Sequence, residues 1–285
     1  MSYFQGKRVF LVGGSEGIGL ATAKALAAAG AAVVVAARRQ GPLDACVSEM
    51  QGVNGAGRYD CISLDVTDRE AVRAAVGAVE EKLGGPVDVL ITNVGAARPG
   101  YIVDLEDDDY DRMIAINYTG HVNVVRAFLP AMAAGGGGDI CLVTSALGFF
   151  STPGYSAYSA SKYALSGFAE SLRMEAADHG IRVTLFYPGT TDTPGLKSEN
   201  EAKPKAVWKM ESESAFNTIY KPEQVATRLL KAIQRGRFEN FPGFDVWLMW
   251  FVYKRFPSLA RYLADQEWRT ALKKVQKEEA EASGT

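Results

Sequence analysis

The chain has 285 residues, of which 47% are hydrophobic and 22% charged, as in a globular protein with a sizeable core. Its 31 basic and 33 acidic residues nearly balance, and a net charge of −2 argues against a nucleic-acid partner. Three cysteines without metal-ligand spacing and only two histidines argue against a metal site. Free thiols and the lack of a signal-peptide core in the first apolar run lead us to expect a cytoplasmic protein.

Short β-branched segments alternate with helical segments from residue 7 onwards. The strand-like segments are, in chain order, KRVFLV, AAVVVAA, RYDCISL, VDVLIT, DICLVT and IRVTLFYP. Each is almost continuously apolar, and each is separated from the next by enough chain for a crossover helix. We expect the first helix at about 17–29. The pattern predicts a parallel sheet covered on both faces, which is the doubly wound α/β arrangement of a Rossmann fold.

A glycine-rich segment, VGGSEGIG (12–19), follows the first strand and opens the first helix. Gly13, Gly17 and Gly19 stand where the backbone must turn tightly and approach a pyrophosphate at the helix N-terminus. The position between a strand and a helix favours a dinucleotide site over a purely structural turn. We expect the rest of the turn to contact the same cofactor, namely Ser15, Glu16 and Ile18.

The second strand ends in VVVAARRQ, where a carboxylate would bind the ribose 2′-hydroxyl of NAD. Ala37 takes that position, and Arg38 and Arg39 follow it. Guanidinium groups suit a 2′-phosphate, so we expect NADPH/NADP; the alternative is a pair of solvated surface arginines. Other candidate cofactor residues follow the carboxyl ends of later strands, although each could serve only its own turn: Asp65, Val66, Asn93 and Gly95.

The segment YSAYSASKYAL (155–165) places Tyr158 and Lys162 four residues apart, on one face of a helix. A phenol has an ordinary pKa near 10, and an adjacent ammonium lowers that pKa by stabilising the phenolate. Such a pair can exchange a proton with an alcohol or a carbonyl oxygen. The alternative is a helix with an incidental tyrosine and lysine.

Two further residues complete a recognisable set. Ser145 ends the fifth strand, thirteen residues before Tyr158, and Asn117 lies in MIAINYTGH. With the glycine motif, these residues resemble the short-chain dehydrogenase/reductase family from about residue 7 to 235. The resemblance implies that Tyr158 is the general acid-base, that Lys162 holds the nicotinamide ribose and poises the tyrosine, that Ser145 holds the substrate oxygen, and that Asn117 supports a proton relay.

The chain departs from the family pattern at two positions. Val12 stands where the family usually has a threonine before the first glycine, and Val94 replaces alanine in Asn-Ala-Gly. We interpret both changes as adjustments of the cofactor site and not as its loss, because the backbone turns remain possible. After the sixth strand, Pro188 and Gly189 look like the family turn beside the nicotinamide. In the same loop, further side chains could hydrogen-bond the carboxamide or the cofactor phosphates: Thr191 and Thr193.

The whole of that loop, YPGTTDTPGLKSENEAKP (187–204), resembles one subfamily, the 3-ketodihydrosphingosine reductases. This resemblance implies NADPH-dependent reduction of the ketone of 3-ketodihydrosphingosine, a long-chain, lipid-like substrate. Two alternatives stay open. One is a short-chain reductase for another ketone, such as a 3-oxoacyl thioester or a steroid. The other is an NADP-binding sensor without catalytic activity.

The α/β pattern ends with a helix that reaches about Gly236. We therefore expect a dinucleotide-binding and catalytic domain over residues 1–236 and a short aromatic-rich extension over 237–285. The extension contains FPGFDVWLMWFVYKRFP (241–257), with seven aromatic side chains, and this run is shorter than the ~20 residues of a membrane-spanning helix.

Three interpretations of the aromatic run are open: packing in the core or in a homo-oligomer, the wall of a pocket for an alkyl chain, and peripheral contact with the cytoplasmic face of a membrane. Family members commonly pair through C-terminal elements, which favours a homo-oligomer. We expect the final charged segment, KKVQKEEAEASGT, to fray. Earlier in the chain, the acidic run at 104–111 is best explained as the start of a helix, through capping and the helix dipole.

Overall fold

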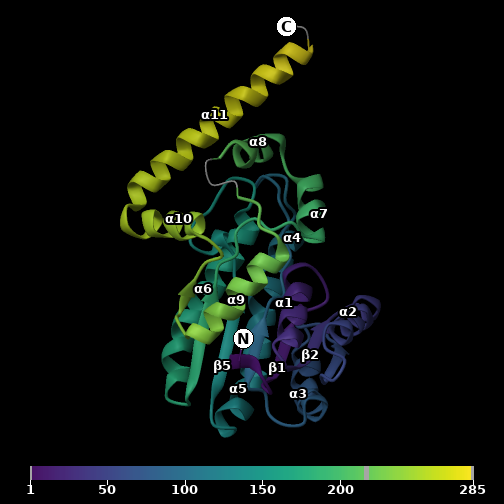
Figure 1. Ribbon diagram of the computed structural model, residues 1–285. Helices are drawn as coiled ribbons and strands as arrows, with labels where there is room; N and C mark the ends of the chain where they lie inside the picture. The colour runs from purple at the N-terminus through teal and green to yellow at the C-terminus, as the bar shows by residue number, and fades with distance from the viewer. Residues whose placement is uncertain (1, 215–217, 284–285) are drawn as a thin grey trace.

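The computed structural model describes residues 2–214 and 218–283, and its centre is a seven-stranded parallel sheet (Figure 1). The strands are β1 (Arg8–Val12), β2 (Ala32–Ala37), β3 (Tyr59–Ser63), β4 (Val89–Thr92), β5 (Gly138–Val143), β6 (Ile181–Phe186) and β7 (Glu239–Asn240). They lie in the order β3-β2-β1-β4-β5-β6-β7. The order reverses between β1 and β4, which makes this the switch point where such sheets bind ligands.

Helices cover both faces of the sheet. They are α1 (Gly17–Ala28), α2 (Gln40–Val53), α3 (Arg69–Leu83), α4 (Asp107–Ile114), α5 (Gly120–Ala134), α6 (Ser156–Ala177), α7 (Pro194–Ala202), α8 (Lys205–Glu213), α9 (Pro222–Arg235), α10 (Phe244–Arg255) and α11 (Pro257–Ser283), with short 3₁₀ turns at Ser2–Phe4 and Ala146–Gly148. One core cluster includes buried residues of α3, α5 and α6, and the other includes buried residues of α1, α2 and α9. The predicted doubly wound α/β fold is confirmed.

Alternation within each strand explains why both faces are apolar. On β1, Val9 and Leu11 join the cluster beneath α1, α2 and α9, whereas Phe10 and Val12 join the cluster beneath α3, α5 and α6. All four side chains are almost fully buried. Burial of each such side chain contributes about 1.5–3 kcal/mol. The continuous apolar runs in the sequence are therefore what a sheet with two covered faces requires.

The short strand β7 decides where the C-terminal extension lies. Leu185 and Phe186 of β6 pair in parallel with Glu239 and Asn240, so both strands end at the same edge of the sheet. Helix α10 begins four residues later, at Phe244. The extension is thereby delivered to the carboxyl edge of the sheet, on the side where α6 lies (Figure 1). Within the described residues, no helix is both long and apolar enough to cross a membrane.

The aromatic run packs partly against the main domain. The ring of Phe241 stacks on Tyr187 with 5.5 Å between centroids, and Trp250 lies 5.3 Å from Phe241. The indole N–H of Trp250 also donates to Glu239 Oε1 at 3.0 Å. This side of α10 is thus core packing, one of the three predicted interpretations.

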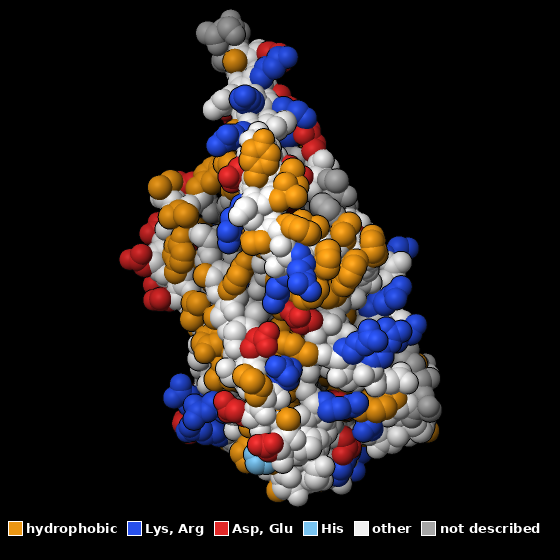
Figure 2. Space-filling view, turned by 90° about the vertical axis from the view of Figure 1, so that its left-hand side faces the viewer, with side chains coloured by type: hydrophobic (Ala, Val, Ile, Leu, Met, Phe, Trp, Pro, Cys, Tyr) orange, Lys and Arg blue, Asp and Glu red, His pale blue; other side chains and the backbone are white. Residues whose placement is uncertain are grey.

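Another side of α10 faces outwards. Phe244 is 69% exposed and Trp247 is 38% exposed, and the Trp247 ring stacks on Phe251. Figure 2 shows hydrophobic side chains gathered on the upper part of this face of the molecule, below the projecting C-terminal helix. One side of the aromatic run is therefore packed against the domain and another is exposed, although its sequence is apolar on all sides.

The prediction that the final segment frays was wrong, because α11 continues to Ser283; residues 284 and 285 lie outside the described part of the chain. Several of its charged side chains form ion pairs: Lys209 of α8 lies 2.6 Å from Glu278, and Lys277 lies 3.7 Å from Glu281. In the acidic run, α4 opens with Asp107, Asp108 and Asp109 in its first turn, where the helix dipole favours negative charge. The N-cap residue makes no side-chain capping bond, so the dipole and not capping explains the pattern.

Candidate active site

A cavity of about 1350 Å³ lies at the switch point and extends to the C-terminal helices. Of the residues predicted to bind cofactor or take part in catalysis, those that line it are Gly13, Ser15, Glu16, Gly17, Ile18, Arg38, Arg39, Asp65, Val66, Asn93, Gly95, Ser145, Tyr158, Lys162, Pro188, Gly189, Thr191 and Thr193. The other two, Gly19 and Asn117, lie behind its wall. Six separate strand ends and loops thus bring the predicted residues to one place.

The tyrosine and lysine project from the first two turns of α6. Lys162 is buried, and its Nζ lies 5.7 Å from the centre of the Tyr158 ring and 3.5 Å from the Val143 carbonyl oxygen, to which it donates. The Ser145 hydroxyl hydrogen-bonds with the Tyr158 hydroxyl and accepts a hydrogen bond from Leu147 N at 3.2 Å. The three side chains of the predicted catalytic set therefore form one contact group.

Exclusion of water dominates the ionisation of this group. It raises the pKa of Tyr158 above the ordinary value, and the hydrogen bond with Ser145 acts in the opposite sense without overcoming it. Burial lowers the pKa of Lys162 to about 7. The expectation that Lys162 lowers the pKa of Tyr158 is therefore not met: burial raises the pKa of the phenol, and burial also disfavours the ammonium that was to lower it. At neutral pH the phenol is protonated and can donate.

Asn117 organises the wall beside the lysine. It lies in a π-helical turn, Ala115–Thr119, between α4 and α5, a local form that is often found at functional sites. Its amide donates to Ala96 O at 2.9 Å and to Ser161 Oγ at 3.0 Å, and its oxygen accepts from Ala96 N at 2.9 Å. A Cβ on Gly95 would lie only 3.3 Å from both Asn117 Oδ1 and Lys162 Nζ. Asn117 therefore ties the turn after β4 to the catalytic helix.

His121 is a positioning residue that our sequence reasoning did not assign. One ring nitrogen lies 2.8 Å from Thr92 Oγ1 and the other lies 2.8 Å from the Val94 carbonyl oxygen. Burial, with a smaller contribution from the charge of Lys162, lowers the pKa of His121 to about 3, so the ring is neutral. It braces the turn that carries Asn93 and Gly95. A histidine on an otherwise apolar helix face was the one signal that could have revealed this role.

The glycine turn has the geometry that a phosphate group needs. Gly13 and Gly17 have φ angles of +78° and +53°, and a Cβ on Gly13 would lie 2.7 Å from Val94 N. A Cβ on Gly19 would lie 1.9 Å from the Gly13 carbonyl oxygen. Asn93 Nδ2 donates to that oxygen at 3.0 Å, so the turns after β1 and β4 are joined although Val12 offers no hydroxyl. The N-terminus of α1 faces the cavity and offers unpaired N–H groups.

The two arginines after β2 differ in their surroundings. Arg39 forms an ion pair with Glu16 of the glycine turn. Arg38 is exposed at the cavity, and its charge contributes to a lowered pKa of Asp65, where hydrogen bonds from Thr67 also outweigh the effect of burial. Arg38 is therefore the more available cation for a phosphate at this end of the cavity.

A family model described as short chain dehydrogenase matches residues 7–204. The chain belongs to the short-chain dehydrogenase family. It is 36% identical over 247 residues to a 3-ketodihydrosphingosine reductase of Bos taurus, covering 86% of this chain and 73% of the relative. It is equally 36% identical to a 3-dehydrosphinganine reductase of Danio rerio, with the same coverage. It is 33% identical to a 3-oxoacyl-[acyl-carrier-protein] reductase of Thermotoga maritima, covering 79% of this chain and 89% of that protein.

Solved structures agree with the fold. A short-chain type dehydrogenase/reductase from Mycobacterium marinum is 28% identical with a TM-score of 0.76, over 84% of this chain and 94% of that chain. A short chain dehydrogenase from Mycobacterium paratuberculosis bound to NAD is 26% identical with a TM-score of 0.74, over 84% of this chain and 96% of that chain. Family membership makes this protein an oxidoreductase.

In this short-chain dehydrogenase the cavity continues from the predicted catalytic group, Ser145, Tyr158 and Lys162, into the C-terminal extension. Its far wall comes from α10 and the first half of α11, with predominantly apolar side chains that include Leu248, Met249, Val252, Tyr253 and Leu263. Four of these residues, Leu248, Met249, Val252 and Tyr253, belong to the aromatic run; that this wall holds an alkyl chain stays a prediction. Sequence reasoning could not single them out, because every position of the run is apolar or aromatic over 246–253.

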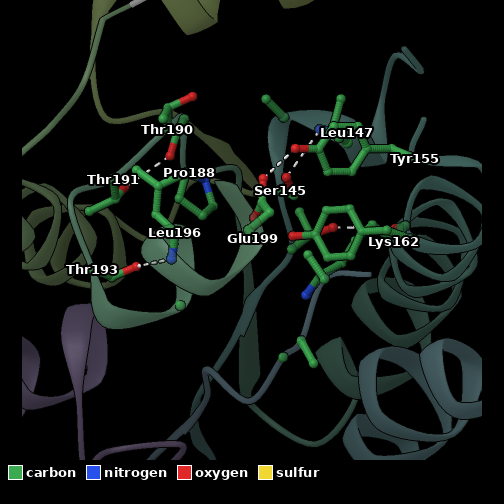
Figure 3. A pocket seen from close by; sticks show the side chains of 18 of the residues that line it. Ser145, Leu147, Tyr155, Lys162, Pro188, Thr190, Thr191, Thr193, Leu196 and Glu199 are labelled. Carbon is green, nitrogen blue, oxygen red and sulfur yellow. Dashed lines mark hydrogen bonds between the residues drawn. The ribbon is translucent and has the colours of Figure 1, made fainter. Parts of the chain in front are cut away.

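The loop after β6 closes the cavity on its other side (Figure 3). Thr193 caps α7 by accepting from Leu196 N at 3.2 Å, and a methyl-sized group on Gly17 would lie 2.9 Å from its Cγ2. The Thr191 hydroxyl donates to Gly189 O at 2.9 Å. Both threonines thus have structural partners and also line the cavity; their contact with a cofactor stays a prediction. Helix α7 then carries Glu199 into the same space.

Proposed function

We propose that this dehydrogenase reduces the ketone of 3-ketodihydrosphingosine to the alcohol with NADPH. The observation that carries the proposal is one cavity that joins the Ser145, Tyr158 and Lys162 group to a long apolar wall. A ketone with a hydrocarbon tail needs both parts. The relatives named for this reaction cover most of the chain and support the same conclusion.

The residues of the cavity fit a dinucleotide with a 2′-phosphate. Gly13 and Gly17 line the cavity at the turn after β1, and the α1 N-terminus beside them supplies N–H donors for a phosphate. Arg38 would bind the 2′-phosphate, because it is exposed at the cavity and Ala37 brings no carboxylate to repel it. Bound NADPH supplies a hydride to the ketone carbon.

The side chains of the chain supply the proton and the orientation. The Tyr158 hydroxyl donates its proton to the ketone oxygen, so that the ketone gains one hydride and one proton and becomes the alcohol. Its raised pKa keeps it protonated for that step. Ser145 holds the same oxygen through a hydrogen bond, and Lys162 holds the nicotinamide ribose beside the tyrosine. Asn117 positions the turn next to Lys162 and supports proton resupply.

We further propose a division of labour along the chain. Residues 1–236 bind the cofactor and perform the chemistry, whereas 237–285 hold the alkyl tail along α10 and α11. Each buried methylene contributes about 0.8 kcal/mol. Exposed Phe244 and Trp247, with Lys254 and Arg255 at the end of α10, suit peripheral contact with the cytoplasmic face of a membrane, from which such a lipid is drawn. Pairing of two copies through the extension is the other proposed use of this surface.

The test follows NADPH oxidation with 3-ketodihydrosphingosine in mixed micelles, beside a 3-oxoacyl thioester and a steroid ketone. We expect preferred turnover of the sphingoid ketone, with kcat/KM falling about fourfold for each methylene removed from the tail. Preference for the thioester or the steroid would refute the substrate while keeping the reductase chemistry. NADPH binding without turnover of any ketone would instead indicate a sensor.

A further inference from the structure

A group of charged side chains lies beside the catalytic residues and has no part in the mechanism above. Tyr155, almost fully buried, donates its hydroxyl hydrogen to Glu199 Oε1. Lys203 Nζ lies 3.6 Å from the same oxygen but only 2.5 Å from Glu211 Oε2, and it donates to Asn200 Oδ1 at 2.9 Å. The Lys203 side chain is 2% exposed. Lys203 is therefore mainly engaged by Glu211.

This group carries one more carboxylate than cation. Among residues 2–214 and 218–283, Lys203 is the one cation that lowers the pKa of Glu199, while Glu211 raises it. Lys274 of α11 does not neutralise Glu199 either, because it forms an ion pair at 2.6 Å with Glu213, the next acidic residue on α8. Burial is the largest influence and raises the pKa of Glu199 overall. A carboxylate in this condition gains strongly from an additional positive charge.

Glu199 lies close to the reaction centre. Its charge raises the pKa of Tyr158, and the rings of Tyr155 and Tyr158 are 6.2 Å apart. Figure 3 shows the hydrogen bond between the Tyr155 hydroxyl and Glu199, which α7 carries into the cavity directly after the threonine loop. Glu199 also lines the cavity. A positive group one carbon away from the reacting ketone would thus meet this carboxylate.

We infer that Glu199 binds the primary ammonium group of an α-amino ketone and thereby selects such substrates over neutral ketones. The inference rests on the proposed function, because 3-ketodihydrosphingosine carries its amine on the carbon next to the ketone. The ammonium donates to the Glu199 carboxylate while the ketone oxygen meets Ser145 and Tyr158. Contacts at both the ammonium and the ketone oxygen would fix which face of the ketone receives the hydride. A 3-oxoacyl thioester or a steroid ketone has no ammonium at this position.

The experiment compares 3-ketodihydrosphingosine with a chain-matched 3-ketone that lacks the 2-amino group, in wild type and in Glu199→Gln. A hydrogen bond between charged groups contributes about 1.5–3 kcal/mol, so the variant should lose on the order of 10- to 100-fold in kcat/KM with the amino ketone only. Calorimetric binding of the amino-alcohol product, against the same alcohol without the amine, should show the same selective loss.

Two variants serve as controls. Tyr155→Phe removes the hydrogen bond to Glu199 but keeps the carboxylate, and Glu201→Gln removes an exposed carboxylate from the same helix, α7, at a position that does not line the cavity. Both should keep the wild-type preference for the amino ketone. If Glu199→Gln and Tyr155→Phe both lose kcat/KM equally with the two ketones and also have a lowered Tm, then the hydrogen bond between Tyr155 and Glu199 has only a structural role. That result would overturn the inference.

The outcomes separate the inference from the proposed function. If wild type reduces the amino ketone and the neutral ketone with equal kcat/KM, long-chain ketone reduction stands and ammonium recognition by Glu199 is refuted. If wild type reduces neither long-chain ketone and binds neither alcohol, the proposed function fails and the inference fails with it.

Discussion

Lys162 Nζ lies 5.7 Å from the centre of the Tyr158 ring, one turn further along the same face of α6. The packed surroundings favour the neutral form of both groups, raising the pKa of the phenol and lowering the pKa of the lysine to about 7. The pair is thus set to donate a proton at neutral pH. Its behaviour can be tested at each of the two residues.

Replacing Tyr158 with phenylalanine removes the proton donor and leaves the ring. We expect kcat to fall by about 10²–10⁴, the usual contribution of a general acid, while the Kd for NADPH measured by fluorescence titration stays nearly unchanged. Ser145 keeps its bond with Leu147 N, so the loop should not collapse. A parallel loss of cofactor binding would instead assign Tyr158 a structural role.

Replacing Lys162 with methionine should change how stability depends on pH. In folded wild type the pKa of Lys162 is about 7, below its ordinary value of 10.5. Between pH 7 and pH 10.5 the unfolded chain therefore holds a proton that the folded chain does not. Stability of wild type relative to Lys162→Met should therefore rise with pH above 7, by up to about 1.4 kcal/mol per pH unit. Below pH 7 the buried charge destabilises wild type fully.

Urea unfolding of the cofactor-free protein at pH 6, 7, 8 and 9 measures this effect. Lys231→Met, at an exposed position on α9, is the matched control and should give a difference from wild type that is independent of pH over this range. If Lys162→Met shows the same pH-independent difference, then the buried lysine is not titrating near neutrality.

Replacing Arg38 with alanine should weaken NADPH specifically. Loss of a charge-assisted contact with the 2′-phosphate predicts a KM for NADPH raised on the order of tenfold, with the KM for NADH almost unchanged. Arg39→Ala should have a smaller effect, since Glu16 already pairs with Arg39. Equal KM changes for NADPH and NADH in Arg38→Ala would contradict a 2′-phosphate contact.

Replacing each of the two tryptophans of α10 with alanine should distinguish the packed side of this helix from its exposed side. Trp250→Ala loses the contact with Phe241 and the bond to Glu239, so we expect a loss of about 1–3 kcal/mol in unfolding free energy. Trp247→Ala should change stability by less than about 0.5 kcal/mol but reduce sedimentation with anionic liposomes. Unchanged liposome binding, with a shift in oligomeric state, would point to protein contact instead.

Prediction from the sequence succeeded where a local pattern carries its own meaning. The apolar runs reflect a sheet with two buried faces, and the glycines reflect turns that only they can make, as Gly13 and Gly17 show. Tyr158 and Lys162 share a helix face by their spacing alone. Prediction failed for the final segment, KKVQKEEAEASGT: we expected it to fray, yet it continues α11 to Ser283, and ion pairs such as Lys209 with Glu278 join it to α8.

The sequence alone determined the fold class and the place of the glycine turn at the switch point, because spacing along strands and helices sets which residues share an edge or a face. The catalytic roles of Tyr158, Lys162, Ser145 and Asn117 stay a prediction that the family resemblance supplies. Only the tertiary structure decided the surroundings of those residues. Burial raised the pKa of Tyr158 against expectation, α10 became a wall of the cavity through the pairing of β7 with β6, and Glu199 came to line the same cavity as Ser145. Each of these depends on contacts between segments far apart in the chain, and these contacts control water exclusion and charge.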